Sequence, residues 1–349
     1  MTNNDRMLAA VMTGPGQIEV RSMPKPSLKP EHVLVRITAC AICTFEQRAY
    51  TGQQKIKYPF VGGHEIVGEI EGWAEGVSSD LQVGDQVSMI ESSCGYCEWC
   101  RQGINIFCKH RPGRMGYQGI IGPWGFSQYV NLHISAVHRF PRRVPDEVGV
   151  FFEPLSCAVH GIRLGRVGMA DDVVIVGGGP MGLLIMLVVK ALGARAFLTE
   201  LQPKRLEKAR ELGATEVIDA SKGDPAEKVM ELTDGKGADA VIVTAGSGEA
   251  NEQALGMIAR RGRLVLFASA HPPTPMKIDP NDMHRREYMV LGAVSKTQQD
   301  AQTAARMLSN GVVDPSPLIE ETRPLEEIEQ AIQRAAEPDS YRVIVRPWK

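Results

Sequence analysis

The stretch Val173-Val174-Ile175-Val176, followed directly by Gly177-Gly178-Gly179-Pro180-Met181-Gly182, determines how this chain folds. Its β-branched run predicts a buried strand, and the apolar residues 181–192 predict a helix. Glycines at G-x-G-x-x-G spacing between a strand and a helix are typical of a dinucleotide-binding turn. They allow a tight turn, close approach of the backbone to a pyrophosphate, and close packing of helix on strand. The phosphates would lie at the helix N-terminus, so we place the nucleotide site at Gly177, Gly179, Pro180, Met181 and Gly182.

An acidic residue is expected about 20 positions after the first glycine, at the end of the next strand. Glu200 stands there, 23 residues after Gly177 and directly after the strand-like run 196–199. Its carboxylate would bond the ribose hydroxyls and repel a 2′-phosphate, which favours NAD over NADP. Lys204 and Arg205 lie close by and leave NADP as an alternative. An α/β domain without a nucleotide is the other alternative, because glycine-rich turns are common in loops.

The pattern on either side of this turn indicates two domains. From Asp172 to about Ser295, β-branched runs alternate with amphipathic helices, which predicts βαβ units and a parallel sheet. The first 150 or so residues are short strands separated by Gly and Pro, which predicts a β-rich, barrel-like domain. After Ser295 we expect helices at 299–308 and 325–336 and a strand at 341–345, too few for a third domain. We therefore predict one domain of residues 1–155 and 296–349 and a second of residues 156–295.

Composition excludes several classes of protein. With 349 residues, 43% of them hydrophobic, and a formal net charge of −2, the chain has no electrostatic reason to bind nucleic acid or an anionic membrane. No stretch reaches the roughly 18 apolar residues of a membrane span, and no apolar secretion signal is visible. Seven cysteines without an export signal favour metal binding or free thiols over disulfides. We expect a cytoplasmic location and a small-molecule partner.

Four of the cysteines form one motif. Cys94, Cys97, Cys100 and Cys108 have the spacing C-x2-C-x2-C-x7-C, and four thiolates so close in sequence can close a tetrahedral shell. Such a site has no open position for water, so the lobe of about residues 91–112 is predicted to hold a structural zinc.

A second group of possible metal ligands is dispersed along the chain. A catalytic zinc needs about three protein ligands and one open position. Cys43, His64, Glu65 and Glu153 are available, all in or bordering the β-rich domain. Taken singly, each is more often an ordinary buried thiol, loop histidine or surface carboxylate.

These motifs occur together, and in the same order, in one known family. In chain order they are Cys43, Gly63-His64-Glu65, Val83-Gly84-Asp85-Gln86-Val87, the four-cysteine lobe, Glu153-Pro154-Leu155-Ser156 and the nucleotide turn. With them the chain resembles the zinc-containing medium-chain alcohol and polyol dehydrogenases over nearly its full length. The resemblance implies an α/β fold: a Rossmann doubly wound parallel sheet plus a GroES-like β-rich catalytic domain, to which the C-terminus returns.

The resemblance also implies a ligand set. In this family the residues that match Cys43 and His64 bind the catalytic zinc, and Glu65 or Glu153 completes the shell. The Glu153-Pro154-Leu155 form is similar to sorbitol, threonine and butanediol dehydrogenases, whereas ethanol-type enzymes use a cysteine from this motif. Glu46 matches an acidic residue that orients the ligand histidine.

Two arginines complete the set of residues that the resemblance implies. Arg205 matches an arginine that packs near the adenosine, and Arg342 matches a C-terminal basic residue close to the site. We place both among the cofactor-binding residues. The family also suggests a homodimer or homotetramer, with the last Rossmann strand and the cysteine lobe as candidate contact surfaces.

One position departs from the family pattern. The usual Cys-Gly-Ser/Thr-Asp/Glu is here Cys43-Thr44-Phe45-Glu46, and Phe45 lacks the hydroxyl that commonly relays the substrate proton. Phe45 should also narrow the catalytic pocket. With no hydroxyl at this position, the carboxylate that is not bound to the metal, Glu65 or Glu153, becomes a candidate to handle the proton.

The predicted reaction is reversible, NAD-linked oxidation of a secondary alcohol, most simply in a polyol, with two zinc ions per chain. A threonine-type amino-alcohol dehydrogenase is the alternative, although it needs a cation for the carboxylate. Zinc-free reductases of the same superfamily lack both ligand sets. A non-catalytic nucleotide-binding protein of the same fold is the remaining alternative, and only Phe45 favours it.

Overall fold

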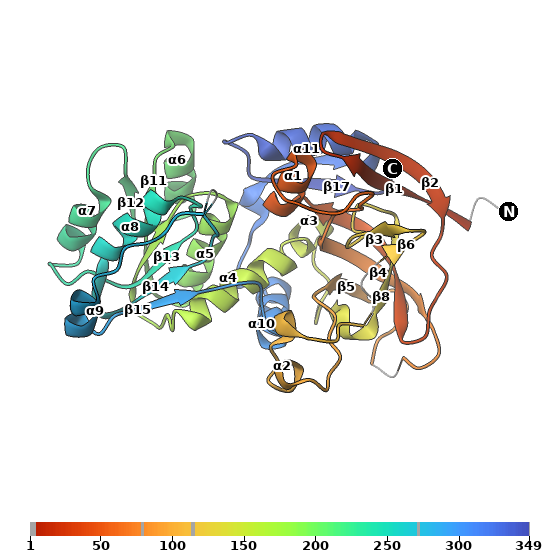
Figure 1. Ribbon diagram of the computed structural model, residues 1–349, viewed down its shortest axis with the longest axis horizontal. Coiled ribbons are helices and arrows are strands. Elements are labelled where there is room, and N and C mark those ends of the chain that lie inside the picture. Colours follow the sequence, from red (N-terminus) through yellow and green to blue (C-terminus); the bar gives the residue numbers. More distant parts are fainter. Residues whose placement is uncertain (1–4, 78–79, 113–115, 271–272, 349) are drawn as a thin grey trace. The chain divides into compact units, whose positions relative to one another are not determined.

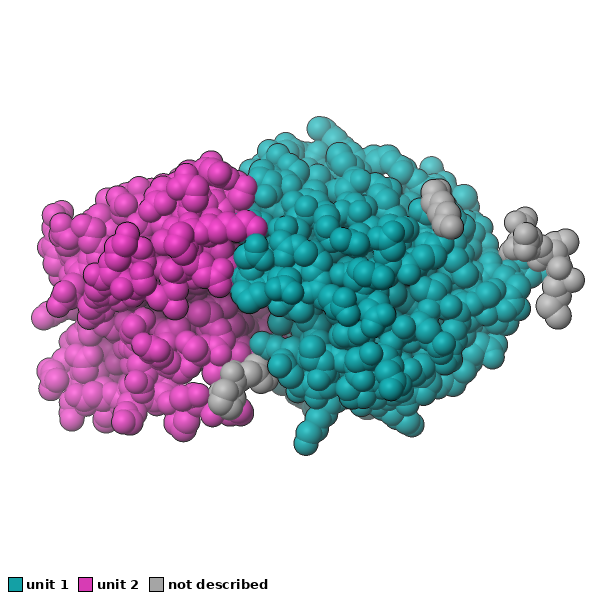
Figure 2. All heavy atoms as spheres, turned by 90° about the horizontal axis from the view of Figure 1, so that it is seen from above, with its two compact units in different colours: residues 1–156, 296–349 teal, residues 157–295 magenta. Residues whose placement is uncertain are grey.

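The computed structural model describes residues 5–77, 80–112, 116–270 and 273–348. The chain divides into two compact units, residues 1–156 with 296–349 and residues 157–295 (Figure 2). No helix in the described ranges is long and apolar enough to cross a membrane.

The first unit is built on a seven-stranded sheet in the order β16-β17-β3-β4-β5-β9, with β8 also pairing with β3 (Figure 1). Its strands and those of two small hairpins are β1 (Arg6–Gly14), β2 (Gln17–Pro24), β3 (His32–Ala41), β4 (Glu65–Trp73), β5 (Gln86–Met89), β6 (Gly116–Tyr117), β7 (Ile120–Ile121), β8 (Tyr129–His133), β9 (Val137–Arg139), β16 (Ile319–Pro324) and β17 (Arg342–Arg346). Alternating apolar residues of these strands meet in one core, in which Val35, Ile37, Ile66 and Val343 are almost fully buried.

Few helices accompany this sheet. They are α1 (Thr44–Thr51), α2 (Glu98–Arg101), α3 (Asp146–Gly149), α10 (Gln298–Ser309) and α11 (Ile328–Ala336), and α4 (Phe152–Leu164) begins in this unit. The helix expected at 325–336 starts with a separate 3-10 turn, Leu325–Glu327. Such a turn is common at a helix N-terminus, and its Leu325 is fully buried in the core.

The second unit is a six-stranded parallel sheet in the order β12-β11-β10-β13-β14-β15, the doubly wound order of a Rossmann fold (Figure 1). The strands are β10 (Asp172–Val176), β11 (Arg195–Glu200), β12 (Glu216–Asp219), β13 (Ala238–Val243), β14 (Ile258–Leu266) and β15 (Met289–Gly292), and the helices are α5 (Pro180–Ala191), α6 (Pro203–Glu211), α7 (Pro225–Leu232), α8 (Gly248–Gly256) and α9 (Pro280–Arg286). Strand β10 is buried along its whole length, as expected for a central parallel strand.

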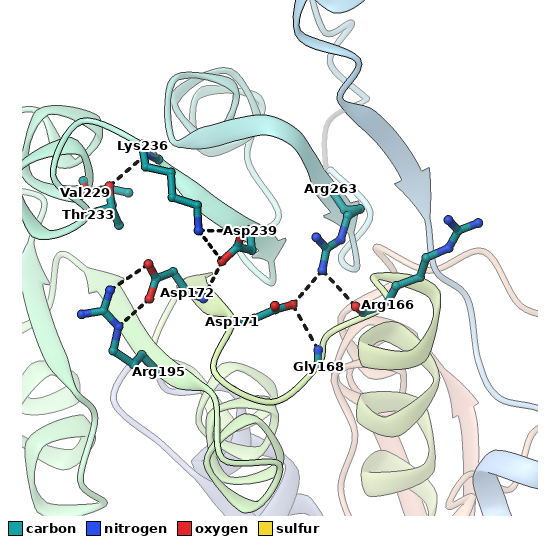
Figure 3. Close-up of polar contacts among 11 residues, drawn as sticks. Arg166, Gly168, Asp171, Asp172, Arg195, Val229, Thr233, Lys236, Asp239 and Arg263 are labelled. Atoms are coloured by element: carbon teal, nitrogen blue, oxygen red, sulfur yellow. Dashed lines mark hydrogen bonds and ion pairs between the residues drawn. The ribbon is translucent and has the colours of Figure 1, made fainter.

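Charged side chains hold the N-terminal ends of these strands (Figure 3). Arg195 donates two hydrogen bonds to Asp172, at 2.5 and 2.8 Å, and so joins the first residues of β10 and β11. The backbone N–H of Asp172 donates to Asp239 in β13, whose carboxylate also pairs with Lys236 at 2.9 Å. Arg263 donates to Asp171 at 2.8 Å. This network lies at the opposite strand ends from the glycine turn, so we regard it as structural.

Candidate functional site

Cys43, His64 and Glu65 form a cluster of possible metal ligands in the first unit. One ligand atom of each lies within 4.8 Å of the others. Cys43 is the N-cap residue of α1, and His64 directly precedes Glu65, the first residue of β4. Glu65 is only 1% exposed and its Oε2 atom has no hydrogen-bond partner. A buried carboxylate oxygen without a partner is costly in a protein, and a bound cation would satisfy it. The three residues therefore fit zinc, which binds sulfur, nitrogen and oxygen ligands.

Gly63 is required by the packing beside this cluster. Its φ of +87° lies in the left-handed region, and a Cβ atom there would come within 2.7 Å of both the Cys40 Sγ atom and the Phe126 nitrogen. Any other residue would push the backbone away from these neighbours and displace His64.

Glu46 links the two sides of the cluster. It is fully buried, and its carboxylate accepts hydrogen bonds from the backbone N–H groups of Cys43, at 3.2 Å, and Gly63, at 3.0 Å. The same carboxylate lies 2.8 Å from Nδ1 of His64. This contact fixes the ring and leaves Nε2 as the nitrogen available to a metal.

Burial and mutual charge change the acidity of all three possible ligands. Burial raises the pKa of the Cys43 thiol, and the charge of Glu65 adds to the effect. Burial raises the pKa of Glu65 to about 7, although the charge of Arg342 opposes it. Burial alone would lower the pKa of His64, but the charges of Glu46 and Cys43 outweigh it and raise this pKa well above its ordinary value. A metal must therefore displace protons that these groups hold firmly.

Arg342, at the start of β17, contacts this cluster. Its Nη2 lies 3.2 Å from Oε1 of Glu65, and its Nη1 donates to the carbonyl of Ile42 at 3.1 Å. Arg342 is 5% exposed, so the ion pair is nearly excluded from water. Its positive charge offsets part of the cost of burying the Glu65 carboxylate. The structure gives Arg342 this partner, and its contact with the cofactor stays a prediction.

Glu153, the other carboxylate predicted for the metal, is not a member of the three-residue cluster. It forms an ion pair with Lys296, which also lies 3.3 Å from Glu91. The Lys296 side chain is 3% exposed. Sequence reasoning missed this lysine, because it is 143 positions from Glu153 and no local pattern distinguishes it from a surface residue.

A pocket of about 1160 Å³ opens beside the cluster in the first unit. Its wall includes His64, Phe45, Glu153 and Lys296. The Phe45 ring packs edge-on against His64, with 6.0 Å between ring centroids, so the position that commonly carries a hydroxyl is apolar here. This pocket is the candidate substrate site.

The four cysteines of the lobe also converge. Their sulfur atoms lie within 4.8 Å of one another, with 3.4 Å between those of Cys97 and Cys100. This separation is far longer than a disulfide bond, and all four cysteines are free. Backbone N–H groups donate to the sulfurs, for example from Cys94 to Cys108 at 3.4 Å, and hydrogen bonds of this kind lower the pKa of Cys97 to about 6. Four thiols around one centre fit a structural zinc.

In the second unit, the glycine turn follows β10 as the sequence requires. Gly177 has a φ of +104°, and a Cβ on Gly182 would lie 1.9 Å from the Gly177 carbonyl oxygen, so neither position tolerates a side chain. Gly179 caps α5, whose first N–H groups face a possible phosphate. Pro180 and Met181 form the first turn of this helix, Pro180 with no N–H to lose.

Glu200 ends β11 beside this turn. Its carboxylate accepts hydrogen bonds from the backbone N–H groups of Gly178, at 2.8 Å, and Gln202, at 3.0 Å. Nη1 of Arg205 lies 3.6 Å from the same carboxylate. The predicted acidic residue and the predicted arginine are thus both near the phosphate-binding turn.

Known proteins match the chain along almost its whole length. Two family sequence models match it: the alcohol dehydrogenase GroES-like domain at residues 29–142 and zinc-binding dehydrogenase at residues 180–310. A sorbitol dehydrogenase of Halalkalibacterium halodurans is 29% identical, covering 98% of this chain and 99% of its own. An L-threonine 3-dehydrogenase of Bacillus licheniformis is also 29% identical, covering 98% and 100%. The crystal structure of a zinc-binding dehydrogenase from Sinorhizobium meliloti bound to NADP superposes with a TM-score of 0.89, at 28% identity and coverage of 98% and 99%.

A GroES-like unit with a mixed sulfur, nitrogen and oxygen ligand cluster, together with a Rossmann unit, defines a zinc- and nicotinamide-dependent oxidoreductase. The chain belongs to the zinc-containing medium-chain dehydrogenase family and is an enzyme of the alcohol and polyol dehydrogenase class. This confirms the family and the fold that the sequence motifs predicted.

Proposed function

We propose that this enzyme uses NAD to oxidise a secondary alcohol of a polyol, or of a related small hydroxylated compound, to a ketone in a reversible reaction. One observation carries the proposal: three possible zinc ligands converge beside a large pocket, and a buried oxygen of Glu65 has no other partner. The likeness to a sorbitol dehydrogenase supports the substrate class. The likeness to an L-threonine 3-dehydrogenase keeps an amino alcohol as the second candidate.

Cys43, His64 and Glu65 would hold the catalytic zinc, and the four cysteines of the lobe a second one. Glu65 is preferred over Glu153 as third ligand because Glu153 is engaged by the buried ammonium of Lys296. When bound there, zinc supplies Lewis acidity that favours the alkoxide form of the alcohol, and NAD accepts the hydride. Arg342 holds Glu65 in place, and Glu46 holds His64 in place.

Glu153 is our candidate for the group that takes the substrate proton. It lines the pocket, and Phe45 has no hydroxyl that could do so. Lys296 bridges Glu153 to Glu91, whose side chain is 25% exposed. All three side chains line the pocket, and a proton taken up by Glu153 would pass along them to Glu91, the most exposed of the three.

We favour NAD as the cofactor because Glu200 ends β11 and accepts a hydrogen bond from Gly178 of the glycine turn, and an acidic residue at this position would bond the ribose hydroxyls of the adenosine and repel a 2′-phosphate. The related structure bound to NADP and the nearby Arg205 make NADP the alternative. A ratio of kcat/KM for NAD over NADP of about ten or more would support the assignment, and a ratio below one would overturn it.

We further propose a cytoplasmic homodimer or homotetramer. Strand β15 lies at one edge of the six-stranded sheet, with no further strand beside it in the described part of the chain, and its backbone groups could pair with a second copy. Light scattering after size-exclusion chromatography gives the subunit number, and a monomer would contradict the proposal.

The function is tested by assaying purified enzyme with sorbitol, xylitol, butane-2,3-diol and L-threonine, each with NAD and with NADP, while zinc is counted by mass spectrometry. We expect two zinc ions per chain and ketone formation from polyols with NAD. Oxidation of L-threonine alone would favour the amino-alcohol reaction. Absence of turnover with every alcohol, with two zinc ions bound, would reject the dehydrogenase assignment.

A further inference from the structure

The substrate pocket is more positive than the protein around it. Five cationic side chains and two carboxylates line it, which leaves three positive charges before any histidine is counted: Lys55, Lys57, Lys109, Arg111 and Lys296 against Glu91 and Glu153. The whole chain has a formal net charge of −2, so the excess is local. The catalytic zinc would not add to it, because a thiolate and a carboxylate neutralise the ion.

The pairing of these groups shows which charges remain available. Lys296 is held between Glu91 and Glu153, so it accounts for both carboxylates of the pocket. Lys109 pairs with Glu98 at 3.3 Å, outside the pocket wall. Arg111 donates to the carbonyl of Ile106, a neutral acceptor that does not balance the charge of its guanidinium group.

Lys55 and Lys57 differ from the other cationic side chains of the pocket in their contacts. Both are exposed, and neither forms an ion pair or a side-chain hydrogen bond with any residue in the described ranges. They lie in the loop between α1 and β4, whose Ile56 and Phe60 also line the pocket. Two like charges two residues apart repel each other, and no partner among the described residues explains why both lysines line the same cavity.

We infer that the substrate of the proposed dehydrogenase reaction carries an anionic group, a phosphate monoester or a carboxylate, that binds to Lys55 and Lys57 while the reacting hydroxyl lies at Cys43, His64 and Glu65. The inference rests on the proposed function and narrows its substrate class. An open-chain polyol with an anionic group fits both places, because its carbon chain separates the group that binds to the lysines from the alcohol that is oxidised at the ligand cluster. Lysine is a regular binder of phosphate and acts as a point charge.

The same charges disfavour an amino alcohol. A carboxylate of L-threonine would find a cation, but the ammonium group beside it would enter a pocket with three excess positive charges. The two carboxylates that could balance it are already in contact with Lys296. An anion without a neighbouring ammonium fits better.

The test compares polyol substrates with and without an anionic group. The holoenzyme is assayed with NAD and with D-sorbitol, D-sorbitol 6-phosphate and D-gluconate. We expect kcat/KM for at least one anionic compound to exceed that of sorbitol by about tenfold, and the more active of the two identifies the phosphate or the carboxylate. An equal or higher value for sorbitol overturns the inference and leaves the dehydrogenase assignment intact. If none of the three compounds is oxidised, the enzyme is assayed with the neutral alcohols named above, xylitol and butane-2,3-diol. Oxidation of one of these, but of neither anionic compound, overturns the inference and leaves the dehydrogenase assignment intact.

Variants then locate the anionic group. Lys55→Gln and Lys57→Gln should each raise KM for the anionic substrate by about threefold, and the double variant by about tenfold, with a smaller change in KM for sorbitol. Lys29→Gln is the matched control, because Lys29 is exposed, belongs to the same unit and does not line the pocket. The KM increase should disappear at high salt, where exposed charges are screened. A rise in KM for NAD, with no change for the anionic substrate, would assign the lysines to the cofactor and overturn the inference.

Discussion

The first unit contains two clusters of possible metal ligands that include cysteine, and the two clusters use cysteine differently. In the lobe, Cys94, Cys97, Cys100 and Cys108 surround one point, and their sulfurs receive hydrogen bonds from backbone N–H groups of the same short segment. In the other cluster a single thiol meets an imidazole and a carboxylate. The lobe is assembled locally from fifteen residues, whereas the mixed cluster needs the start of α1, the start of β4 and a salt bridge from β17.

This difference teaches what each site can do. Four thiolates fill a tetrahedral shell, so no reactant can reach the metal. Three mixed ligands leave one position open, and a pocket adjoins them. The mixed cluster also has buried partners that hold its ligands, Glu46 and Arg342, while α2 of the lobe buries no residue. We therefore expect one site to determine activity and the other to determine stability.

The largest expected effect comes from removing a ligand of the mixed cluster. Cys43→Ala should lower kcat/KM by about a thousandfold or more, because the metal and its Lewis acidity are lost. Zinc content should fall from two to one ion per chain. Cys40→Ala is the thiol control, since Cys40 is a buried cysteine of β3 whose sulfur donates to the Ala41 carbonyl and also interacts with the backbone of Glu65, without being one of the three possible ligands. Normal activity in Cys43→Ala, or a loss of zinc in Cys40→Ala, would break the distinction.

The lobe should show the opposite profile. Cys100→Ser should also reduce zinc to one ion per chain, but with kcat for the folded protein within about twofold of the parent. Because a structural metal contributes folding free energy, the unfolding midpoint should fall by about 5–10 °C. Calorimetry and zinc counting on the same preparation check both statements. A thousandfold loss of activity with unchanged thermal stability would assign the catalytic role to the lobe instead.

The lobe and the mixed cluster also differ in how far sequence can predict them. The spacing of Cys94 to Cys108 predicts a metal site without any structure, because all its ligands are local. The glycine turn is predictable for the same reason. Cys43 and His64, 21 positions apart, became a pair only through the resemblance to a family.

Contacts between distant segments lay beyond prediction. Lys296 meets Glu153 across 143 positions, and neither hydrophobic period nor motif indicates such a contact. The early part of β14 is hard to predict for a local reason: Arg260, Arg261 and Arg263 interrupt its apolar pattern, and the strand forms through pairing with β13.

An intermediate effect is expected from Glu46, the residue whose carboxylate contacts His64. Its replacement should change zinc affinity at the mixed cluster and not at the lobe. Glu46→Gln should weaken zinc binding at this cluster by about 10–100-fold, because the carboxylate that orients His64 loses its charge. Competition with a chromophoric chelator measures the change. Glu98→Gln is the control: Glu98 is exposed and pairs with Lys109 at the lobe, so neither zinc affinity should change. A similar loss in both variants would mean that the effect is general electrostatics and not ligand orientation.

The smallest difference is expected in the response to pH. Protons compete with zinc for each ligand, so a ligand whose pKa is raised yields its metal at a higher pH. In the mixed cluster burial raises the pKa of Glu65 to about 7 and that of Cys43 above its ordinary value. In the lobe backbone N–H groups lower the pKa of Cys97 to about 6, although that of Cys100 is raised to about 12, chiefly by desolvation.

Acidification should therefore release the metal of the mixed cluster first, at a higher pH than that of the lobe. Cobalt replaces zinc in this experiment, because a four-sulfur site and a mixed site absorb visible light differently and can be followed in one titration. Cys43→Ala and Cys100→Ser, each with one metal left, assign the two transitions. Release of the four-sulfur signal at the higher pH would show that sharing protons among four neighbouring thiols outweighs the hydrogen bonds that stabilise their charged forms, and it would reverse the order of the two sites.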